Sequence, residues 1–320
     1  MSYITDRKRY LEIIDEMRKK KISMALFCTA SHWNTEAILL ACSRFAAKYD
    51  IGRIPVGIGI TFSYPHMSQA ARVTYSGDLQ TGFKSIMKHL HLLCGSDDAP
   101  YSRVDALPHL DHADPGMDIW ALTHGIDYLA SIMFDAQHYP FEENVRLTSE
   151  YVKEYGSRVM VEGIIDELSV AGNMVGSGNH YIQKVFDYIN RTNVDFLVAD
   201  LGTEQQSNSV GKCEYKKDRA AEMTRVLGKS MLALHGTSCL TSEQMKGLAD
   251  DGVIRVNMWT RIARESGQYA AEELLKRADR IQHGDFEACE SKQYIRDSIE
   301  KASAIMEEIL YILGYHKLAG

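Results

Sequence analysis

Short runs of β-branched and other apolar residues alternate along the chain with longer segments whose apolar positions follow helical spacing. This alternation is typical of βα units repeated around a parallel sheet. Eight strands are predicted, at residues 23–28, 54–61, 103–110, 128–135, 158–162, 196–201, 230–234 and 253–257. Helices are predicted between them at residues 36–49, 141–155, 182–191 and 242–250. Eight strands that alternate with helices are the number that closes a barrel, so the predicted fold class is α/β, a (β/α)8 TIM barrel.

Two further charged helical segments, residues 270–282 and 291–313, follow the last predicted strand. They exceed what a barrel requires, so we expect a helical extension over about residues 269–320 that caps the barrel or pairs subunits. The chain contains only six prolines, and no tract rich in serine, glycine and proline that would serve as a linker. We therefore expect a single domain over residues 1–320.

The composition narrows the classes of partner. With 45% hydrophobic and 25% charged residues, a chain of 320 residues can bury a large core. The net charge of -7 leaves no broad basic field for binding nucleic acid or an anionic membrane. The longest apolar runs fall far short of a membrane span, and the first residues are charged where a signal peptide would turn apolar. We expect a cytoplasmic protein that binds neither nucleic acid nor membranes.

The cysteines give no sign of a metal ribbon or a disulfide framework. Six of them are scattered without a C-x-x-C pair: Cys28, Cys42, Cys94, Cys213, Cys239 and Cys289. This spacing fits reduced thiols better than bridged ones. The sequence also lacks a Walker loop and a G-x-G-x-x-G turn between a strand and a helix, so a nucleotide-binding fingerprint is absent.

Polar residues gather where the predicted strands end, and in a barrel of this kind that end carries the active site. The third strand runs into His109, Asp111 and His112, a cluster that packing explains poorly. The seventh strand ends at His235, next to a loop whose amides and hydroxyls could cradle an anion. Neutral imidazoles from separate strands are common zinc ligands, so we predict a metal site on this rim.

Other polar residues at the strand ends have a structural interpretation beside a functional one. Asp135 is a candidate to support a metal ligand from behind, whereas His138 could simply mark the entry to a helix. Glu162 shares strand parity with Ile164, so its carboxylate would be buried in the barrel and needs a partner, either a metal or a lysine or arginine. Asp200, within the sixth predicted strand, is either paired or functional.

Several motifs follow one another in the order found in a known family. They are H-L-D-H at 109–112, S-I-M-F-D at 131–135, H-Y-P-F-E-E-N at 138–144, V-E at 161–162, L-H-G-T-S at 234–238 and V-N at 256–257. With V-D and G-T at either end of 194–203, and Thr260, they resemble the class II, metal-dependent fructose-bisphosphate and tagatose-bisphosphate aldolases over about residues 20–262. The long run after Pro140, which contains an asparagine, is the most specific part of this resemblance.

The resemblance implies roles for four residues that match the family pattern. His112 and His235 are expected to be metal ligands. Asp111 is expected to be the acid/base group near the scissile carbon–carbon bond, and Asn257 to contact the enediolate. The resemblance also implies a divalent metal, usually zinc, that stabilises the enediolate left by retro-aldol cleavage.

The sequence departs from the family pattern at the third metal ligand. Gln205, a neutral and weaker ligand, stands where the family has its third histidine, so the expected ligand set is His112, His235 and Gln205, with Glu204 or an added carboxylate as alternatives to Gln205. The resemblance makes zinc the expected metal. Because weak oxygen ligands lower the affinity for zinc, manganese or cobalt is the alternative.

The proton-abstracting base of the family also has no counterpart. Ile164 stands in place of the second glutamate of a V-E-A-E motif, and residues 169–180 contain no glutamate. Asp166, Glu167 and His180 are the candidates to replace the missing base.

The loops that grip phosphate in the family are altered too. The pattern H-G-G-S-G reads H-G-T-S-C at 235–239, and Trp259 stands where the family has an acidic or amide residue. The candidates to hold an anion are Gly236, Ser238, Thr260 and Arg261, with a surface position as the alternative for Arg261. We expect a sugar acid or a differently placed phosphate as the substrate.

Three functions are open at this point. The first, which we expect, is a lyase that carries out metal-assisted retro-aldol cleavage, or the reverse condensation, of a ketose phosphate or sugar acid. The second is a metal-dependent isomerase or epimerase of a related sugar, which the missing base favours. The third is a non-catalytic descendant that binds a sugar, which the loss of the third histidine favours. The family resemblance implies a homodimer or a homotetramer.

Overall fold

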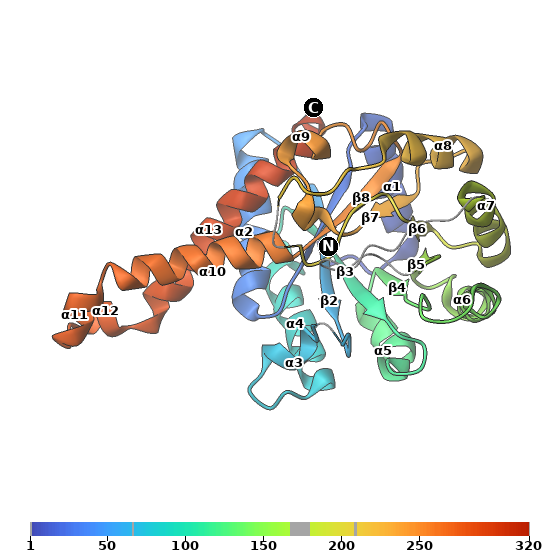
Figure 1. Ribbon diagram of the computed structural model, residues 1–320. Coiled ribbons are helices and arrows are strands. Elements are labelled where there is room, and N and C mark those ends of the chain that lie inside the picture. The colour runs from blue at the N-terminus through green and yellow to red at the C-terminus, as the bar shows by residue number, and fades with distance from the viewer. Residues whose placement is uncertain (1, 66, 167–179, 208–209, 320) are drawn as a thin grey trace.

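The computed structural model describes residues 2–65, 67–166, 180–207 and 210–319, and these form a closed barrel of parallel strands (Figure 1). The strands run in sequence order, and β1 pairs with β8 to close the barrel. They are β1 (Met24–Cys28), β2 (Ile54–Thr61), β3 (Val104–Ala113), β4 (Ser131–Phe134), β5 (Met160–Ile164), β6 (Phe196–Val198), β7 (Leu232–Leu234) and β8 (Val253–Met258). The predicted TIM barrel with additional C-terminal helices is thus confirmed.

Helices surround this barrel and follow the strands. The longer ones are α1 (Arg7–Lys20), α2 (His32–Lys48), α4 (Leu79–Cys94), α6 (Phe141–Tyr155), α7 (Tyr181–Thr192), α8 (Lys217–Leu227), α10 (Thr260–Leu275) and α13 (Ser291–Ile312). The shorter ones are α3 (Ala70–Val73), α5 (Ile119–Thr123), α9 (Ser242–Met245), α11 (Ala278–Gln282) and α12 (Phe286–Cys289). Within the described ranges, no helix combines the length and the apolar character that crossing a membrane requires.

Every strand residue is buried, which explains why the strands appear in the sequence as continuous apolar runs.

Polar side chains at N-caps define where several helices begin. Asp6 and Asp78 accept a hydrogen bond from a backbone N–H in the first turn of α1 and α4 respectively. Ser31 does the same for α2, directly after β1.

Several predicted elements are shorter in the structure, among them the fourth strand, the seventh strand, the sixth strand and the helix at residues 242–250. β6 ends at Val198, so Asp200 lies in the following loop, where it pairs with Lys216 and Arg219. The helix predicted over residues 242–250 spans only Ser242–Met245, because Gly247 adopts a positive φ of 78°.

The first C-terminal helix begins earlier than predicted, the helix predicted at residue 291 begins there, and both are part of the fold. α10 starts directly after β8, and α13 packs against both α10 and α2. Beyond α13, the buried Tyr315 hydroxyl accepts from the Ala25 N–H and donates to the Pro55 carbonyl. Figure 1 shows α10 and α13 side by side, carrying α11 and α12 away from the barrel.

The expectation of reduced cysteines is wrong for one pair, because Cys213 and Cys239 form a disulfide. The four remaining cysteines, Cys28, Cys42, Cys94 and Cys289, are free. The bonded residues are 26 positions apart and lie in the loops after β6 and β7. These loops meet because β6 and β7 are neighbours in the barrel, a proximity that cysteine spacing alone does not reveal.

Candidate metal centre and substrate pocket

Asp111 and His112 are neighbours in sequence, yet both side chains reach the same site. Consecutive side chains of a regular strand point to opposite faces. Here the register of β3 against β4 shifts between Leu110 and Ala113, and His112 adopts the left-handed region with a φ of 49°. Left-handed backbone is unfavourable for a residue with a Cβ, and such strain is concentrated at functional sites.

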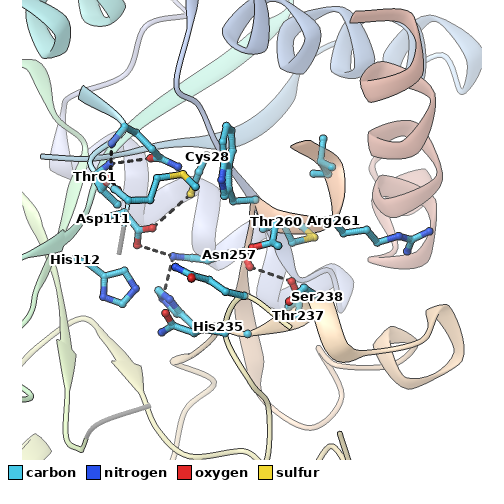
Figure 2. A pocket seen from close by; sticks show the side chains of 18 of the residues that line it. Cys28, Thr61, Asp111, His112, His235, Thr237, Ser238, Asn257, Thr260 and Arg261 are labelled. Carbon is cyan, nitrogen blue, oxygen red and sulfur yellow. Dashed lines mark hydrogen bonds between the residues drawn. The ribbon is translucent and has the colours of Figure 1, made fainter. Parts of the chain in front are cut away.

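The structure brings Asp111, His112 and His235 together at the carboxyl end of the barrel (Figure 2). All three are buried, and one potential ligand atom from each lies within 4.8 Å of the others. Two imidazoles and a carboxylate form a donor set that suits zinc and other divalent transition metals. The described residues therefore fit the metal that the sequence predicts.

A carboxylate fixes the orientation of His112. Its Nδ1 lies 2.7 Å from Asp135 Oδ2, and the Gln137 side chain donates to the same oxygen over 3.0 Å. The Tyr64 ring stacks on the imidazole, with 4.4 Å between ring centroids. Asp135 thus lies behind His112, one of the two histidines that the sequence predicts as metal ligands, and contacts this imidazole through Nδ1.

A second carboxylate contacts His235. Glu162 Oε1 lies 3.1 Å from His235 Nε2, and the other oxygen of Glu162 pairs with Arg255. The buried Glu162 therefore has the partner that the sequence required, and this partner is an arginine together with a histidine. Asn257 joins the cluster, with its Nδ2 2.9 Å from His235 Nε2 and 3.3 Å from Asp111 Oδ1.

Burial and charge set the protonation states of the cluster. Burial lowers the pKa of His235 to about 4, with the charge of Asp111 opposing the shift. Burial also lowers the pKa of His112, but the charge of Asp111 and the hydrogen bond to Asp135 outweigh it, so this pKa is raised. Burial raises the pKa of Asp111, but the neighbouring His112 and the His109 imidazole, 3.7 Å away, lower it by more, so the pKa lies below its ordinary value and Asp111 is ionised. A neutral His235 is available as a metal ligand.

These residues open into a pocket at the carboxyl end of the barrel, where active sites of TIM barrels lie. Gln205 lines its wall and accepts a hydrogen bond of 3.1 Å from the Tyr64 hydroxyl. The four predicted anion-binding residues also line the pocket: Gly236, Ser238, Thr260 and Arg261. In Figure 2 the Arg261 guanidinium points away from the histidines, and its Nε pairs with Glu265 over 2.9 Å.

A family model for class II fructose-bisphosphate aldolases matches residues 8–317, nearly the whole chain. The chain belongs to this family. A fructose-bisphosphate aldolase of Geobacillus stearothermophilus is 29% identical over 261 residues, which cover 78% of this chain and 79% of that protein.

Solved aldolase structures share the fold of this family member at low identity. A fructose-bisphosphate aldolase from Campylobacter jejuni superposes with a TM-score of 0.77 at 18% identity, covering 96% of this chain and 95% of that chain. The YdjI aldolase from Escherichia coli K12 superposes with a TM-score of 0.66 at 18% identity, covering 96% and 97%.

The loop after β7 of this class II aldolase family member is packed against the loop after β6. Gly236 has a positive φ of 70°, and a Cβ at this position would lie 2.8 Å from the backbone carbon of Glu204. Only glycine allows this approach, which places the segments that carry His235 and Gln205 side by side. The Ser238 hydroxyl accepts from the Ser207 N–H over 3.1 Å.

Not every sequence candidate joins the site. His138 is exposed, and Asp200 is held by cations outside the pocket lining. Among the candidates for the missing base, Asp166 pairs with Lys184, and His180 stands at the N-cap position of α7 without a side-chain capping hydrogen bond. Glu167, the third candidate, lies outside the described residues.

Three residues of the site were not predicted from the sequence. Arg255 could have been found, because it shares strand parity with Asn257 and a charge at an inward position of a buried strand requires a partner. Tyr64 gives no such signal in the sequence. Cys28, at the end of β1, has its sulfur 3.4 Å from Asp111 Oδ2; burial first, and then the charge of Asp111, raises the pKa of this thiol well above its ordinary value.

Proposed function

We propose that this protein is a carbon–carbon lyase that catalyses metal-dependent retro-aldol cleavage, or the reverse condensation, of a ketose phosphate or sugar acid. One observation carries the proposal. Asp111, His112 and His235, from two separate strand ends, converge in a buried cluster within 4.8 Å. Such a concentration of buried polar groups at the carboxyl rim of a TIM barrel is costly for folding and typical of an active site.

His112 and His235 would hold the metal, with Gln205 as a neutral third ligand. Zinc is the expected ion, and manganese or cobalt is the alternative because an amide oxygen is a weaker and harder ligand than imidazole. When bound, a divalent ion supplies Lewis-acid chemistry that polarises the ketose carbonyl and offsets the negative charge of the enediolate.

Asp111 is the proton carrier in this proposal. Its carboxylate accepts from the Cys28 thiol on one oxygen and from the Asn257 amide on the other, and it is ionised, so it can accept the proton of the hydroxyl on the aldehyde side during cleavage. In condensation the same carboxyl returns the proton. The Asn257 amide contacts both Asp111 and His235, so it is placed between the proton carrier and a metal ligand, where it can donate to the enediolate.

The anionic end of the substrate would bind between the loop after β7 and the start of α10. Gly236, Ser238 and Thr260 line this part of the pocket, and backbone N–H groups and hydroxyls of these residues are the donors that we propose for the anion. Arg261 contributes positive charge at longer range, because its guanidinium is engaged by Glu265.

Product analysis tests the proposed reaction. Metal-reconstituted protein would be incubated with a panel of ketose phosphates and keto sugar acids, and the products measured by mass spectrometry. A lyase yields two fragments whose masses sum to that of the substrate. A product with the mass of the substrate would indicate an isomerase or epimerase instead. A protein that binds metal and sugar but converts none of the panel would contradict the catalytic proposal.

A further inference from the structure

The disulfide between Cys213 and Cys239 joins the loop after β6 to the loop after β7. The first loop carries Gln205 and the second begins at His235, and both of these residues line the pocket. The two sulfurs belong to residues of different exposure, because Cys213 is half-buried whereas Cys239 has no exposed surface. A disulfide with one accessible sulfur is open to exchange with an external thiol, whereas burial of both sulfurs protects a structural bond.

The disulfide lies beside the hydrogen bonds that connect the two loops. The Ser207 N–H donates to the Ser238 hydroxyl over 3.1 Å, and the Gly211 N–H donates to the Cys239 carbonyl over 2.6 Å. These bonds join loops rather than strands, and such bonds open more readily than those inside a barrel. The covalent link therefore contributes to keeping the two loops together.

Thiol–disulfide exchange at this bond would begin at Cys213. A thiolate of the reductant forms a bond to the Cys213 sulfur, the bond between the two cysteines breaks, and Cys239 leaves as a thiolate that takes up a proton. The Glu204 N–H lies 3.4 Å from the Cys239 sulfur and can donate to the departing thiolate. A second thiol of the same reductant then attacks the mixed disulfide. This step releases Cys213 as a thiol and leaves the reductant as a disulfide, so two electrons and two protons pass to the protein.

Hydrogen bonds that do not involve the sulfurs keep the two cysteines close after reduction. The Gln244 side chain, which takes part in the capping box of α9, donates to the Cys213 carbonyl over 2.8 Å. The Gly211 N–H holds the Cys239 carbonyl on the other side. Because these contacts survive the loss of the bond, the thiols remain near each other and an oxidant can join them again.

We propose that Cys213–Cys239 is a reversible thiol–disulfide exchange site for a dithiol reductant, and that its reduction loosens the two loops and weakens anion binding in the pocket. The exchange and the loosening rest on the disulfide and its neighbours alone. The effect on anions also rests on the proposed function, which assigns the anionic end of the substrate to the loop after β7.

The exchange can be followed in the full-length protein, isolated without reductant and compared before and after treatment with dithiothreitol. Thiol alkylation and mass spectrometry should find Cys213 and Cys239 blocked before treatment and alkylated after it. Amide hydrogen exchange at Ser207 and Gly211 should become faster by about 10-fold or more. Exchange at Ala25, a barrel amide that donates to a buried hydroxyl, should not change. Oxidised glutathione should restore the original state.

Inorganic phosphate is the probe for the effect on the pocket. It should bind the reduced protein about 3- to 10-fold more weakly, because binding must then order the loosened loop. Cys213→Ser should match the reduced parent and no longer respond to dithiothreitol. The reduced parent serves alone if this variant does not fold. Cys289→Ser, which removes an exposed free cysteine, is the matched control and should behave as the parent does.

Three results would overturn the exchange site: a bond that dithiothreitol reduces only after the protein unfolds, thiols that oxidised glutathione does not join, or reduction that leaves amide exchange unchanged. Loosened loops with an unchanged phosphate affinity would overturn the link to the pocket. A protein whose loops loosen on reduction but that binds phosphate in neither state would support the exchange site and contradict the anion site of the proposed function.

Discussion

At the scale of single residues, His112 shows how a local departure from regular structure builds the site. Its φ of 49° costs roughly 1–3 kcal/mol for a residue with a side chain. Because of this conformation, two consecutive residues, Asp111 and His112, face the same pocket. Asp135 and Tyr64 hold the imidazole in this orientation through a hydrogen bond and ring stacking. The backbone strain is offset by contacts that exist only in this conformation.

Asp111→Asn separates proton transfer from metal binding. The amide keeps the shape of the side chain but cannot accept and return a proton, so turnover should fall by about 10²- to 10⁴-fold. Metal content should stay at the parental level, because His112, His235 and Gln205 are unchanged. Metal analysis and initial rates on the same preparation check both parts. If metal is lost as well, Asp111 is a ligand and the proposed division of roles is wrong.

Asp135→Asn tests the support behind His112. Loss of the charged acceptor at Nδ1 should weaken metal binding by about 10- to 100-fold. Asp200→Asn is the control, because this carboxylate also lies close to the rim but pairs with Lys216 and Arg219 rather than with a histidine. Calorimetric titration of metal-free protein gives both affinities. Equal affinities in the two variants would show that Asp135 does not tune the imidazole.

At the scale of elements, the strands and their ends could be predicted from the sequence better than their contacts. Continuous apolar runs identify buried parallel strands, and polar residues at their ends identify the rim, which is why Asp111, His112 and His235 could be proposed together. The bulge in β3 and the pairing of the loops after β6 and β7 depend on neighbouring strands, and no local pattern encodes them. The proximity of Cys213 and Cys239 was missed for this reason.

The disulfide should stabilise the loops that carry Gln205 and His235. Closing a loop across 26 positions is worth roughly 3 kcal/mol in the chain-entropy treatment. Cys213→Ser should therefore lower the free energy of unfolding by about 2–4 kcal/mol in denaturant titrations. Cys289→Ser, at an exposed free cysteine, is the control and should have little effect. If reductant leaves the parent's unfolding curve unchanged, the bond is not formed in solution.

At the scale of the whole molecule, the C-terminal helices are tied into the barrel rather than appended to it. The chain that follows α13 returns to the amino-terminal side of the strands through Tyr315, which bonds to backbone groups of Ala25 and Pro55. Sequence periodicity identified these helices as extra but could not show where they attach, because the attachment depends on the packing of α13 against α2 and α10 and on the Tyr315 hydroxyl, contacts between segments far apart in the sequence.

Tyr315→Phe tests this attachment. Removing the hydroxyl leaves the buried Ala25 N–H without its partner, so the free energy of unfolding should fall by about 1–3 kcal/mol. Metal content should be unchanged, since the hydroxyl is remote from the pocket lining. Tyr311→Phe, at a largely exposed position, is the control. A thermal or denaturant midpoint that does not move would argue that the C-terminal segment is only loosely attached.

The central claim is that the buried histidines hold a catalytic metal, and metal content tests it most directly. Protein purified without chelator would be analysed by elemental mass spectrometry beside His112→Ala, His235→Ala and the control His138→Ala, which changes an exposed histidine near the same rim. The account predicts close to one divalent ion per chain in the parent and in the control, and its loss in both site variants. A folded parent that carries no metal and takes none up from added Zn2+, Mn2+ or Co2+ would contradict it.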